Sequence, residues 1–293
     1  QNILEQELSK NKEIKNYCEI INTPDIIKDN ESPLTAAKRG KNSSMWKAIE
    51  SQKDKLTDIS LSAGNTGALL FISRLILNCI EGINKPALAG LWPNYNNMSV
   101  VLDLGANIEC DQKNLLDFTS MGSALYKSLF DTKYPKVALL NVGQEEIKGN
   151  EVIKKTFSTL KNNKTDNFEF CGYIEGNQIM DGEIDIIVTD GFTGNIALKT
   201  AEGTANFITS ELRKALTGNI IGKVSSLLNI KNINSFKKKL DPRLYNGAIL
   251  LGLNSPVVKS HGGTDYIGFA NAISVCEKII SGRLIEKIKE NIN

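Results

Sequence analysis

Short runs of branched aliphatic residues recur along the chain, and each is followed by a loop rich in glycine, asparagine or aspartate and then by apolar residues at helical spacing. The runs occupy residues 58–61, 100–102, 137–140 and 184–188. This alternation is typical of β-strand, loop and α-helix units. Because buried parallel strands need helices over both faces, the units predict a mostly parallel sheet in a three-layer α/β/α fold.

Helical periodicity of the apolar residues predicts helices over residues 66–81, 112–130, 149–161, 193–216 and 265–292. The last of these places six apolar residues on one stripe: Phe269, Ile273, Cys276, Ile280, Leu284 and Ile288. We expect Thr264 or Asp265 to cap that helix. Composition marks no domain boundary, so we expect residues 1–293 to form a single domain.

Composition narrows the possible functions. The 35 Lys+Arg nearly balance the 33 Asp+Glu, so we expect no nucleic-acid partner. The five cysteines include no CxxC pair, which argues against a disulfide framework or a zinc site and favours a reducing cytoplasm. We expect no metal and no cofactor. The chain has no run of about 18 apolar residues, and its start resembles no signal peptide, so we expect a soluble, cytoplasmic protein.

The loops that follow the four predicted strands carry the candidate chemistry. In open parallel sheets, ligands bind beyond the carboxyl ends of the strands, where amides at helix N-termini point outward. We therefore expect the loops at residues 62–67, 103–107, 141–143 and 189–195 to lie along one edge. Glycine allows close backbone approach, and Asn, Ser and Thr supply neutral hydrogen bonds to an anion. One such loop is more often a plain connection, but four together predict an anion site.

These loops match neither common nucleotide fingerprint. There is no GxxxxGK[ST] loop, and no GxGxxG with an acidic residue further along. A kinase and a typical nicotinamide dehydrogenase are therefore disfavoured. The segment from Lys41 to Met45 offers a lysine and two hydroxyls ahead of a helical segment, which suits an oxyanion. An N-cap serine in an ordinary turn explains the same residues equally well.

The single histidine, His261, precedes the last predicted helix. A lone histidine excludes a multi-histidine metal site, so His261 either contacts substrate or serves as a hydrogen-bonding residue of its loop. Asp103 and Asp190 each end an apolar strand. They could bind a cation, but orienting loop amides is the more usual role of an aspartate at a strand end.

Several short sequence motifs, taken in order, resemble those of one family, the PlsX phosphate acyltransferases of bacterial phospholipid synthesis. The motifs are Lys41–Met45, Ser62–Ala68, Leu102–Asn107, Met121–Ser123, Leu140–Glu146, Lys148–Glu151, Val188–Asn195 and His261–Gly262. They run in order over most of the chain. The family's first strand and its glycine-rich Asp-Ala-Met-Gly-Gly-Asp loop have no equivalent in the sequence.

The resemblance implies transfer of a long acyl chain from acyl carrier protein to inorganic phosphate. The acyl phosphate would then serve a glycerol-3-phosphate acyltransferase. The resemblance also implies a homodimer, loosely attached to the membrane surface, with a fold related to isocitrate and isopropylmalate dehydrogenases and to phosphate acetyltransferases.

The residues fit this chemistry without a strong acid or base. Phosphate is already an anionic nucleophile, and a thiolate with a conjugate acid of pKa about 8.5 is a good leaving group. We assign catalytic roles to Asn65, His261 and Asn195. Phosphate would bind at the first predicted loop, with Lys41 or Lys199 adding positive charge, and the acyl carbonyl or pantetheine arm at Thr193 and Gly194. The other expected substrate contacts are Ser43, Ser44, Ser62, Gly64, Thr66, Asp103, Asn107, Asn141, Gly143 and Asp190.

The stretch 214–245 combines apolar residues at helical spacing with many lysines. Its apolar members are Leu216, Ile220, Val224, Leu227 and Leu228. Such a helix can lie on anionic lipid, and a basic patch can receive an acidic carrier protein; packing inside a dimer is the plainer alternative.

Two other functions stay open: a phosphate acetyl- or butyryltransferase that uses coenzyme A, and a non-catalytic scaffold at the membrane. A dehydrogenase of the related fold is less well supported, because there is no Arg-rich loop and no aspartate cluster.

Overall fold

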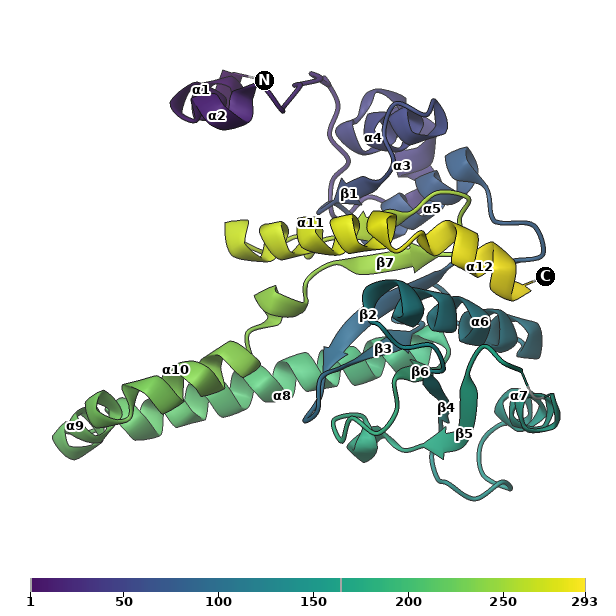
Figure 1. The fold of residues 1–293 in the computed structure, drawn as a ribbon. Helices are drawn as coiled ribbons and strands as arrows, with labels where there is room; N and C mark the ends of the chain where they lie inside the picture. The colour runs from purple at the N-terminus through teal and green to yellow at the C-terminus, as the bar shows by residue number, and fades with distance from the viewer. Residues whose placement is uncertain (1, 164, 293) are drawn as a thin grey trace.

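The computed structural model describes residues 2–163 and 165–292, in which one mixed sheet lies between two layers of helices (Figure 1). The strand order is β1-β8-β7-β2-β3-β6-β4-β5. The strands are β1 (Ser60–Ser62), β2 (Ala87–Pro93), β3 (Met98–Leu102), β4 (Lys136–Leu140), β5 (Glu169–Ile174), β6 (Ile186–Val188), β7 (Ala248–Leu251) and β8 (Val257–Lys259). The predicted three-layer α/β/α architecture is therefore confirmed.

Strand direction changes in the middle of the sheet. β1 pairs in parallel with β8, and β3, β6, β4 and β5 are parallel to one another. Between these two sets, β8–β7, β7–β2 and β2–β3 are antiparallel pairs. Three reversals leave β1 and β8 running opposite to β3, β4 and β6.

Helices cover both faces of the sheet, and five of their ranges were predicted from the sequence. The bounds are α1 (Asn2–Lys10), α2 (Lys12–Lys15), α3 (Pro33–Arg39), α4 (Ser44–Lys53), α5 (Thr66–Leu77), α6 (Gln112–Leu129), α7 (Glu151–Asn162), α8 (Gly191–Thr217), α9 (Ile220–Leu228), α10 (Ile230–Lys239), α11 (Tyr266–Ser281) and α12 (Leu284–Ile292). Short 3-10 turns are η1 (Gly40–Asn42), η2 (Gly176–Gln178) and η3 (Pro242–Tyr245).

The core is divided by the sheet into two hydrophobic clusters. Val100 and Leu102 of β3 point into one cluster, which α6, α7, α11 and α12 cover, whereas Val101 points into the other, which α3, α4, α5 and α8 cover. Successive residues of a strand face opposite sides. Because both sides are covered, the central strands consist of continuous apolar runs.

The last predicted helix is in fact two. α11 ends at Ser281, Arg283 has a φ of 52°, and α12 begins at Leu284. Asp265 is the N-cap, and its carboxylate accepts from the amides of Ile267 and Gly268. The six residues of the predicted stripe do not share one environment: Cys276, Leu284 and Ile288 are buried, whereas Phe269, Ile273 and Ile280 are exposed. The buried face of α11 consists of Gly268, Ala272, Val275, Cys276 and Ile279, so the predicted stripe lies along the border of that face.

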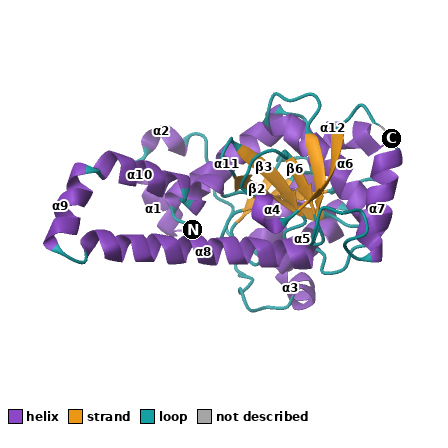
Figure 2. Ribbon diagram, turned by 90° about the horizontal axis from the view of Figure 1, so that it is seen from below, coloured by secondary structure: helices purple, strands orange, loops and turns teal. Residues whose placement is uncertain are grey.

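The 27 residues of α8 form a helix much longer than the strands beside it. Its C-terminal half projects from the sheet, α9 turns at the far end, and α10 returns toward the sheet, apart from α8 in Figure 2 (Figures 1 and 2). We call residues 205–240 the arm. The predicted amphipathic element at 214–245 is thus helical and lies largely in the arm; the side chains of Ile220, Lys223 and Val224 lie outside the described ones. None of the described helices is long and apolar enough to cross a membrane.

Candidate functional site

The four predicted loops lie at two edges of the sheet. The loop after β1 and the loop after β8 lie at one edge, which we call the β1 edge. The loops after β3, β4 and β6 lie at the opposite edge, which we call the β6 edge. β1 and β6 are five strands apart, and strands are spaced about 4.8 Å apart, so roughly 24 Å separates them. The expectation that all four loops share one edge is wrong, because strand direction is set by pairing partners remote in sequence.

At the β1 edge, two helices begin beside one glycine. Ser43 caps α4, its Oγ accepting from the Trp46 amide at 3.3 Å, and Asn65 caps α5, its Oδ1 accepting from the Ala68 amide at 2.9 Å. A methyl group on Gly64 would lie 2.8 Å from Cε of Met45, in the first turn of α4. The first-turn amides of Ser44 and Thr66 have no acceptor within their helices. Two positive helix ends therefore meet at the predicted phosphate loop.

Several polar groups of this loop are already bonded within the protein. Nδ2 of Asn65 donates to the carbonyls of Asp29 (2.7 Å) and Glu31 (3.1 Å). The Gly64 amide donates to Oγ of Ser62, and the Ser43 hydroxyl donates to the Gly40 carbonyl. Asn65 and Ser43 therefore shape the loop, and an anion would be bound by free amides and by exposed side chains such as Ser44, Thr66 and Lys41.

His261 is brought to the same edge. The Ser260 amide donates to the Ser62 carbonyl at 2.9 Å, and a methyl group on Gly262 would lie 3.1 Å from the Ala63 carbonyl. The Gly263 amide donates to Nδ1 of His261 at 3.1 Å. Because Nδ1 is the acceptor, the neutral imidazole carries its proton on Nε2, and that N–H is free to donate. His261 is exposed and adjoins the predicted phosphate loop, as a substrate donor should.

Lys259 is a cation of this edge that sequence reasoning missed. Its side chain is half-buried, and Nζ donates to the Ser260 carbonyl at 2.5 Å. Burial lowers the pKa of its ammonium, and the nearby Asp29 acts in the opposite direction. Its position at the end of β8, two residues before His261, was the available signal. Lys199, by contrast, lies on α8 and forms an ion pair with Glu202 at 2.7 Å.

At the β6 edge, Asp103 organises its own loop. Its carboxylate accepts from the amides of Gly105 (3.2 Å), Ala106 (3.0 Å) and Asn107 (2.7 Å), and also from the Leu88 amide (2.9 Å). Burial raises the pKa of Asp103, while these hydrogen bonds lower it. Asp103 therefore orients loop amides, the more usual of its two predicted roles, and those amides are not free for an external anion.

The start of α8 packs directly against this loop. The Gly191 amide donates to the Asn107 carbonyl at 2.8 Å, and a methyl group on Gly194 would overlap the Asp103 carbonyl oxygen. Asp190 caps the helix, so the Thr193 amide donates to its carboxylate and the Gly194 amide to its carbonyl. The amides predicted to hold an acyl carbonyl are therefore occupied.

Asn195 remains as a free polar side chain at the same place. It lies beside Gly105, whose φ is 124°, and its amide has no hydrogen-bond partner in residues 2–163 and 165–292. Asn107, in contrast, donates from Nδ2 to the Pro86 carbonyl and to Asp103. Among the predicted groups of the β6 edge, Asn195 is thus free to contact a ligand.

The loop after β4 is closed on itself. Nδ2 of the buried Asn141 donates to the carbonyls of Gly143 (3.1 Å) and Lys148 (3.2 Å). Its Oδ1 is buried without a partner in the described structure, and Gly149, with a φ of 93°, passes close to it. Asn141 and Gly143 therefore shape this loop, and the exposed Lys148 side chain adds a positive charge beside it.

A groove of about 350 Å³ opens at the β6 edge between the starts of α7 and α8. Its walls mix apolar and polar side chains, and the polar groups come from the caps and first turns of the two helices and from the loop that carries Glu109 and the half-buried Cys110. The lining residues are Ile108, Glu109, Cys110, Leu115, Asn150, Val152, Ile153, Asp190, Phe192 and Thr193. Burial raises the pKa of the Cys110 thiol to about 11, so the thiol stays protonated at neutral pH.

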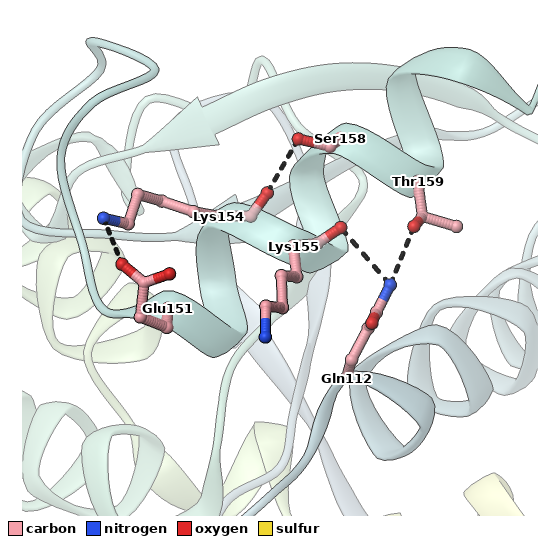
Figure 3. A pocket seen from close by; sticks show the side chains of 6 residues that line it. All are labelled: Gln112, Glu151, Lys154, Lys155, Ser158 and Thr159. Atoms are coloured by element: carbon pink, nitrogen blue, oxygen red, sulfur yellow. Dashed lines mark hydrogen bonds and ion pairs between the residues drawn. The ribbon is translucent and has the colours of Figure 1, made fainter.

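A hollow of about 410 Å³ lies between α6 and α7 (Figure 3). Most of its polar groups bond to one another: Lys154 pairs with Glu151 at 2.6 Å, and Nε2 of Gln112 donates to Oγ1 of Thr159 at 2.7 Å. The ammonium of Lys155 has no ion-pair partner among the described residues, but a single exposed lysine does not make a ligand site, so we treat the hollow as an ordinary groove between helices. Within residues 2–163 and 165–292, no cluster of three His, Cys, Asp or Glu could hold a metal ion.

Replacing Asn65 by alanine tests the loop at the β1 edge. The change removes the α5 cap and both tethers to residues 29–31, so we expect a loss of about 2 kcal/mol in the free energy of unfolding. Phosphate saturation should also weaken, because the loop loses its shape. Asp111→Ala, which removes the cap of α6, should cost about 1 kcal/mol and leave phosphate saturation unchanged. Unchanged phosphate saturation in Asn65→Ala would remove this loop from the site.

The chain is similar to known proteins over most of its length. The family described as "Fatty acid synthesis protein" matches residues 1–287. A phosphate acyltransferase of Pelagibacter ubique (strain HTCC1062) is 68% identical over 274 residues, which cover 94% of this chain and 82% of that protein. A phosphate acyltransferase of Maricaulis maris (strain MCS10) is 40% identical over 287 residues, which cover 98% of this chain and 82% of that protein.

Solved structures with a similar fold include the EutD phosphotransacetylase from Staphylococcus aureus. Its TM-score is 0.52 at 15% identity, over 95% of this chain and 84% of that one. A branched-chain phosphotransacylase from Enterococcus faecalis V583 has a TM-score of 0.53 at 14% identity, over 80% and 78%. At these identities the likeness shows the shared fold alone.

Proposed function

The chain belongs to the fatty acid synthesis protein family of phosphate acyltransferases, and we propose that it transfers a long acyl chain from acyl carrier protein to inorganic phosphate. The carrying observation is the meeting of the α4 and α5 N-termini at Gly64. Two adjacent helix N-termini suit a small oxyanion. The partly buried Lys259 adds positive charge at the same edge.

The reaction requires positioning and charge stabilisation more than acid or base strength. A phosphate oxygen attacks the thioester carbonyl carbon, the carbonyl oxygen becomes an oxyanion, and the carbon–sulfur bond then breaks to release a thiolate. The Nε2–H of His261 can donate to that oxyanion or to the departing sulfur. The thiolate takes its proton from solvent, and the acyl phosphate is released.

The two edges then have different roles. Asn195 cannot contact a phosphate held at Gly64 of the same chain, because several strands lie between them. We therefore replace the single composite site predicted from the sequence by a phosphate loop at the β1 edge and, at the β6 edge, a separate groove of mixed apolar and polar lining together with Asn195, which lies beside Gly105. We assign the groove to part of the acyl donor, since its exposed rim includes Ile108 and Phe192.

One experiment separates the donors. Purified protein and inorganic phosphate are mixed with a long-chain acyl carrier protein thioester, the matching coenzyme A thioester or acetyl coenzyme A. Acyl phosphate is trapped as the hydroxamate, and free thiol is measured in parallel. We expect phosphate-dependent acyl phosphate with the carrier-protein donor. Turnover with acetyl coenzyme A alone would favour the short-chain alternative, and no turnover with any donor would favour the scaffold.

The arm is the proposed contact with the membrane surface. Leu227 and Leu228 are 72% and 81% exposed, and Ile221 is 79% exposed. Lys237, Lys238 and Lys239 lie in the last turn of α10. Exposed apolar side chains in α9 and clustered lysines at the far end of α10 fit anionic lipid, with each lysine worth about 1 kcal/mol near the surface. This would make the protein peripheral on the inner face of the membrane.

Leu227→Glu tests the arm. Replacing an inserted leucine by a charge should lower binding to vesicles containing anionic lipid about tenfold in a flotation assay, because apolar burial is lost and repulsion is added. Leu56→Glu is the matched control, because Leu56 is 77% exposed in the loop after α4 and lies far from the arm in sequence. Equal flotation of the two variants would exclude the arm as the anchor.

A further inference from the structure

Asn246 joins three segments of the chain at the β1 edge. It follows η3 directly and is only 8% exposed. Its Nδ2 donates to Oγ of Ser260 and to the Gly268 carbonyl, both at 2.8 Å, and its Oδ1 accepts from the His261 amide at 2.9 Å. One side chain therefore holds the end of η3, the loop that carries His261 and the first turn of α11.

The hydrogen bonds continue from Asn246 to the phosphate loop. Ser260, which is fully buried, donates its amide to the Ser62 carbonyl at 2.9 Å. Oγ of Ser62 in turn accepts from the Gly64 amide at 3.2 Å. An unbroken path of protein hydrogen bonds thus runs from Asn246 to the glycine at which α4 and α5 meet.

The position of Asn246 is itself held by an ion-pair network. Arg243 of η3 donates to Asp241 at 2.6 Å and to Asp265, the N-cap of α11, at 2.7 Å. The guanidinium lowers the pKa of both carboxyls. This clamp fixes η3, the return end of the arm, against α11, so Asn246 keeps one orientation toward His261.

We propose that Asn246 is a positioning residue that sets the distance between the imidazole of His261 and the anion held at Gly64. Asn246 contacts neither substrate, and it acts through the His261 amide and through Ser260. The proposal rests on the proposed function, because it takes the Gly64 loop as the phosphate site. Buried side-chain amides with three satisfied hydrogen bonds are well suited to such a role, since any rotation leaves buried polar groups unpaired.

The single histidine of the sequence makes a direct test possible. Tag-free protein has one imidazole Cε1–H resonance in a proton NMR spectrum, and inorganic phosphate can be titrated while it is followed. In the unsubstituted protein we expect a saturable shift. In Asn246→Ala the resonance should differ before phosphate is added, and half-saturation should need about tenfold more phosphate. The phosphate KM should rise by the same factor while the acyl-donor KM stays unchanged.

Two further variants sharpen the result. Asn254→Ala is the control, because Nδ2 of Asn254 also donates to two carbonyls, those of Leu77 and Cys79, but at the β6 edge. Its His261 resonance and its phosphate half-saturation should equal those of the unsubstituted protein. Ser260→Ala removes one bond of Asn246 and should raise the phosphate requirement about threefold, which keeps the test available if Asn246→Ala does not fold.

A folded Asn246→Ala with an unchanged His261 resonance and unchanged phosphate half-saturation would overturn the proposal. Failure of the proposed function has a different signature. It would appear as no acyl phosphate from the unsubstituted protein, and the His261 resonances compared without phosphate would still decide whether Asn246 positions the imidazole.

Discussion

Gly194→Ala is expected to destabilise the protein by about 3 kcal/mol and to abolish acyl transfer. The added methyl group would overlap the Asp103 carbonyl oxygen and would lie 3.0 Å from Cγ2 of Thr189. Backbone cannot rotate away as a side chain can, so the start of α8 must move off the loop that follows β3. Urea unfolding gives the free-energy change, and acyl phosphate formation gives the activity.

Gly203→Ala is the matched control in the same helix. A methyl group there meets nothing within 4 Å, and alanine is favoured over glycine inside a helix, so we expect a gain of about 0.5 kcal/mol and normal activity. If both variants unfold at the same urea concentration, α8 is not packed against Asp103 as the structure shows.

Asp103→Ala should lower the free energy of unfolding by about 4 kcal/mol. The carboxylate is fully buried and is the acceptor for the amides of Leu88, Gly105, Ala106 and Asn107. Removing it leaves the buried Leu88 amide and the partly buried loop amides without this acceptor, and each such group costs about 1–3 kcal/mol unless water enters. The measurement is again urea unfolding, with hydrogen exchange of the loop amides as a local readout.

Asp131→Ala is the control for the loss of a carboxylate that has no structural role. Asp131 is exposed in the loop after α6, and surface changes of this kind usually stay within about 0.5 kcal/mol. A loss in Asp103→Ala no larger than that of Asp131→Ala would show that the loop amides find other acceptors and that Asp103 does not organise the β6 edge.

In the proposed function, the two edges divide the chemistry of this transferase. At the β1 edge, helix ends, Lys259 and His261 gather groups that suit phosphate and a departing thiolate. At the β6 edge, Asp103, Asp190 and Asn141 use their polar groups within the protein, and Asn195 with the groove remains for a ligand. Loops of similar composition thus serve different purposes, because their hydrogen bonds end on different partners.

The sequence by itself determined the features that depend on neighbouring residues. Helical spacing placed α5, α6, α7 and α8 close to their observed bounds, and continuous aliphatic runs placed β3, β4 and β6. Asp265 caps α11 as expected from its position. Caps and periodicity act over a few residues, so they can be read directly from the order of side chains.

Tertiary structure alone decided which of these loops meet. β2, β7 and β8 were not predicted. Because β8–β7, β7–β2 and β2–β3 are antiparallel pairs, β1 and β3 run in opposite directions. That reversal separates Gly64 from Asn195. The parallel pairing of β1 with β8 joins the loop of His261 to Ser62, and the antiparallel pairing of β7 with β8 brings Asn246 to both. Strand pairing joins residues far apart in sequence, and its direction leaves no trace in local periodicity. For the same reason the sequence showed the glycine, asparagine and histidine groups but not the edge at which each would act.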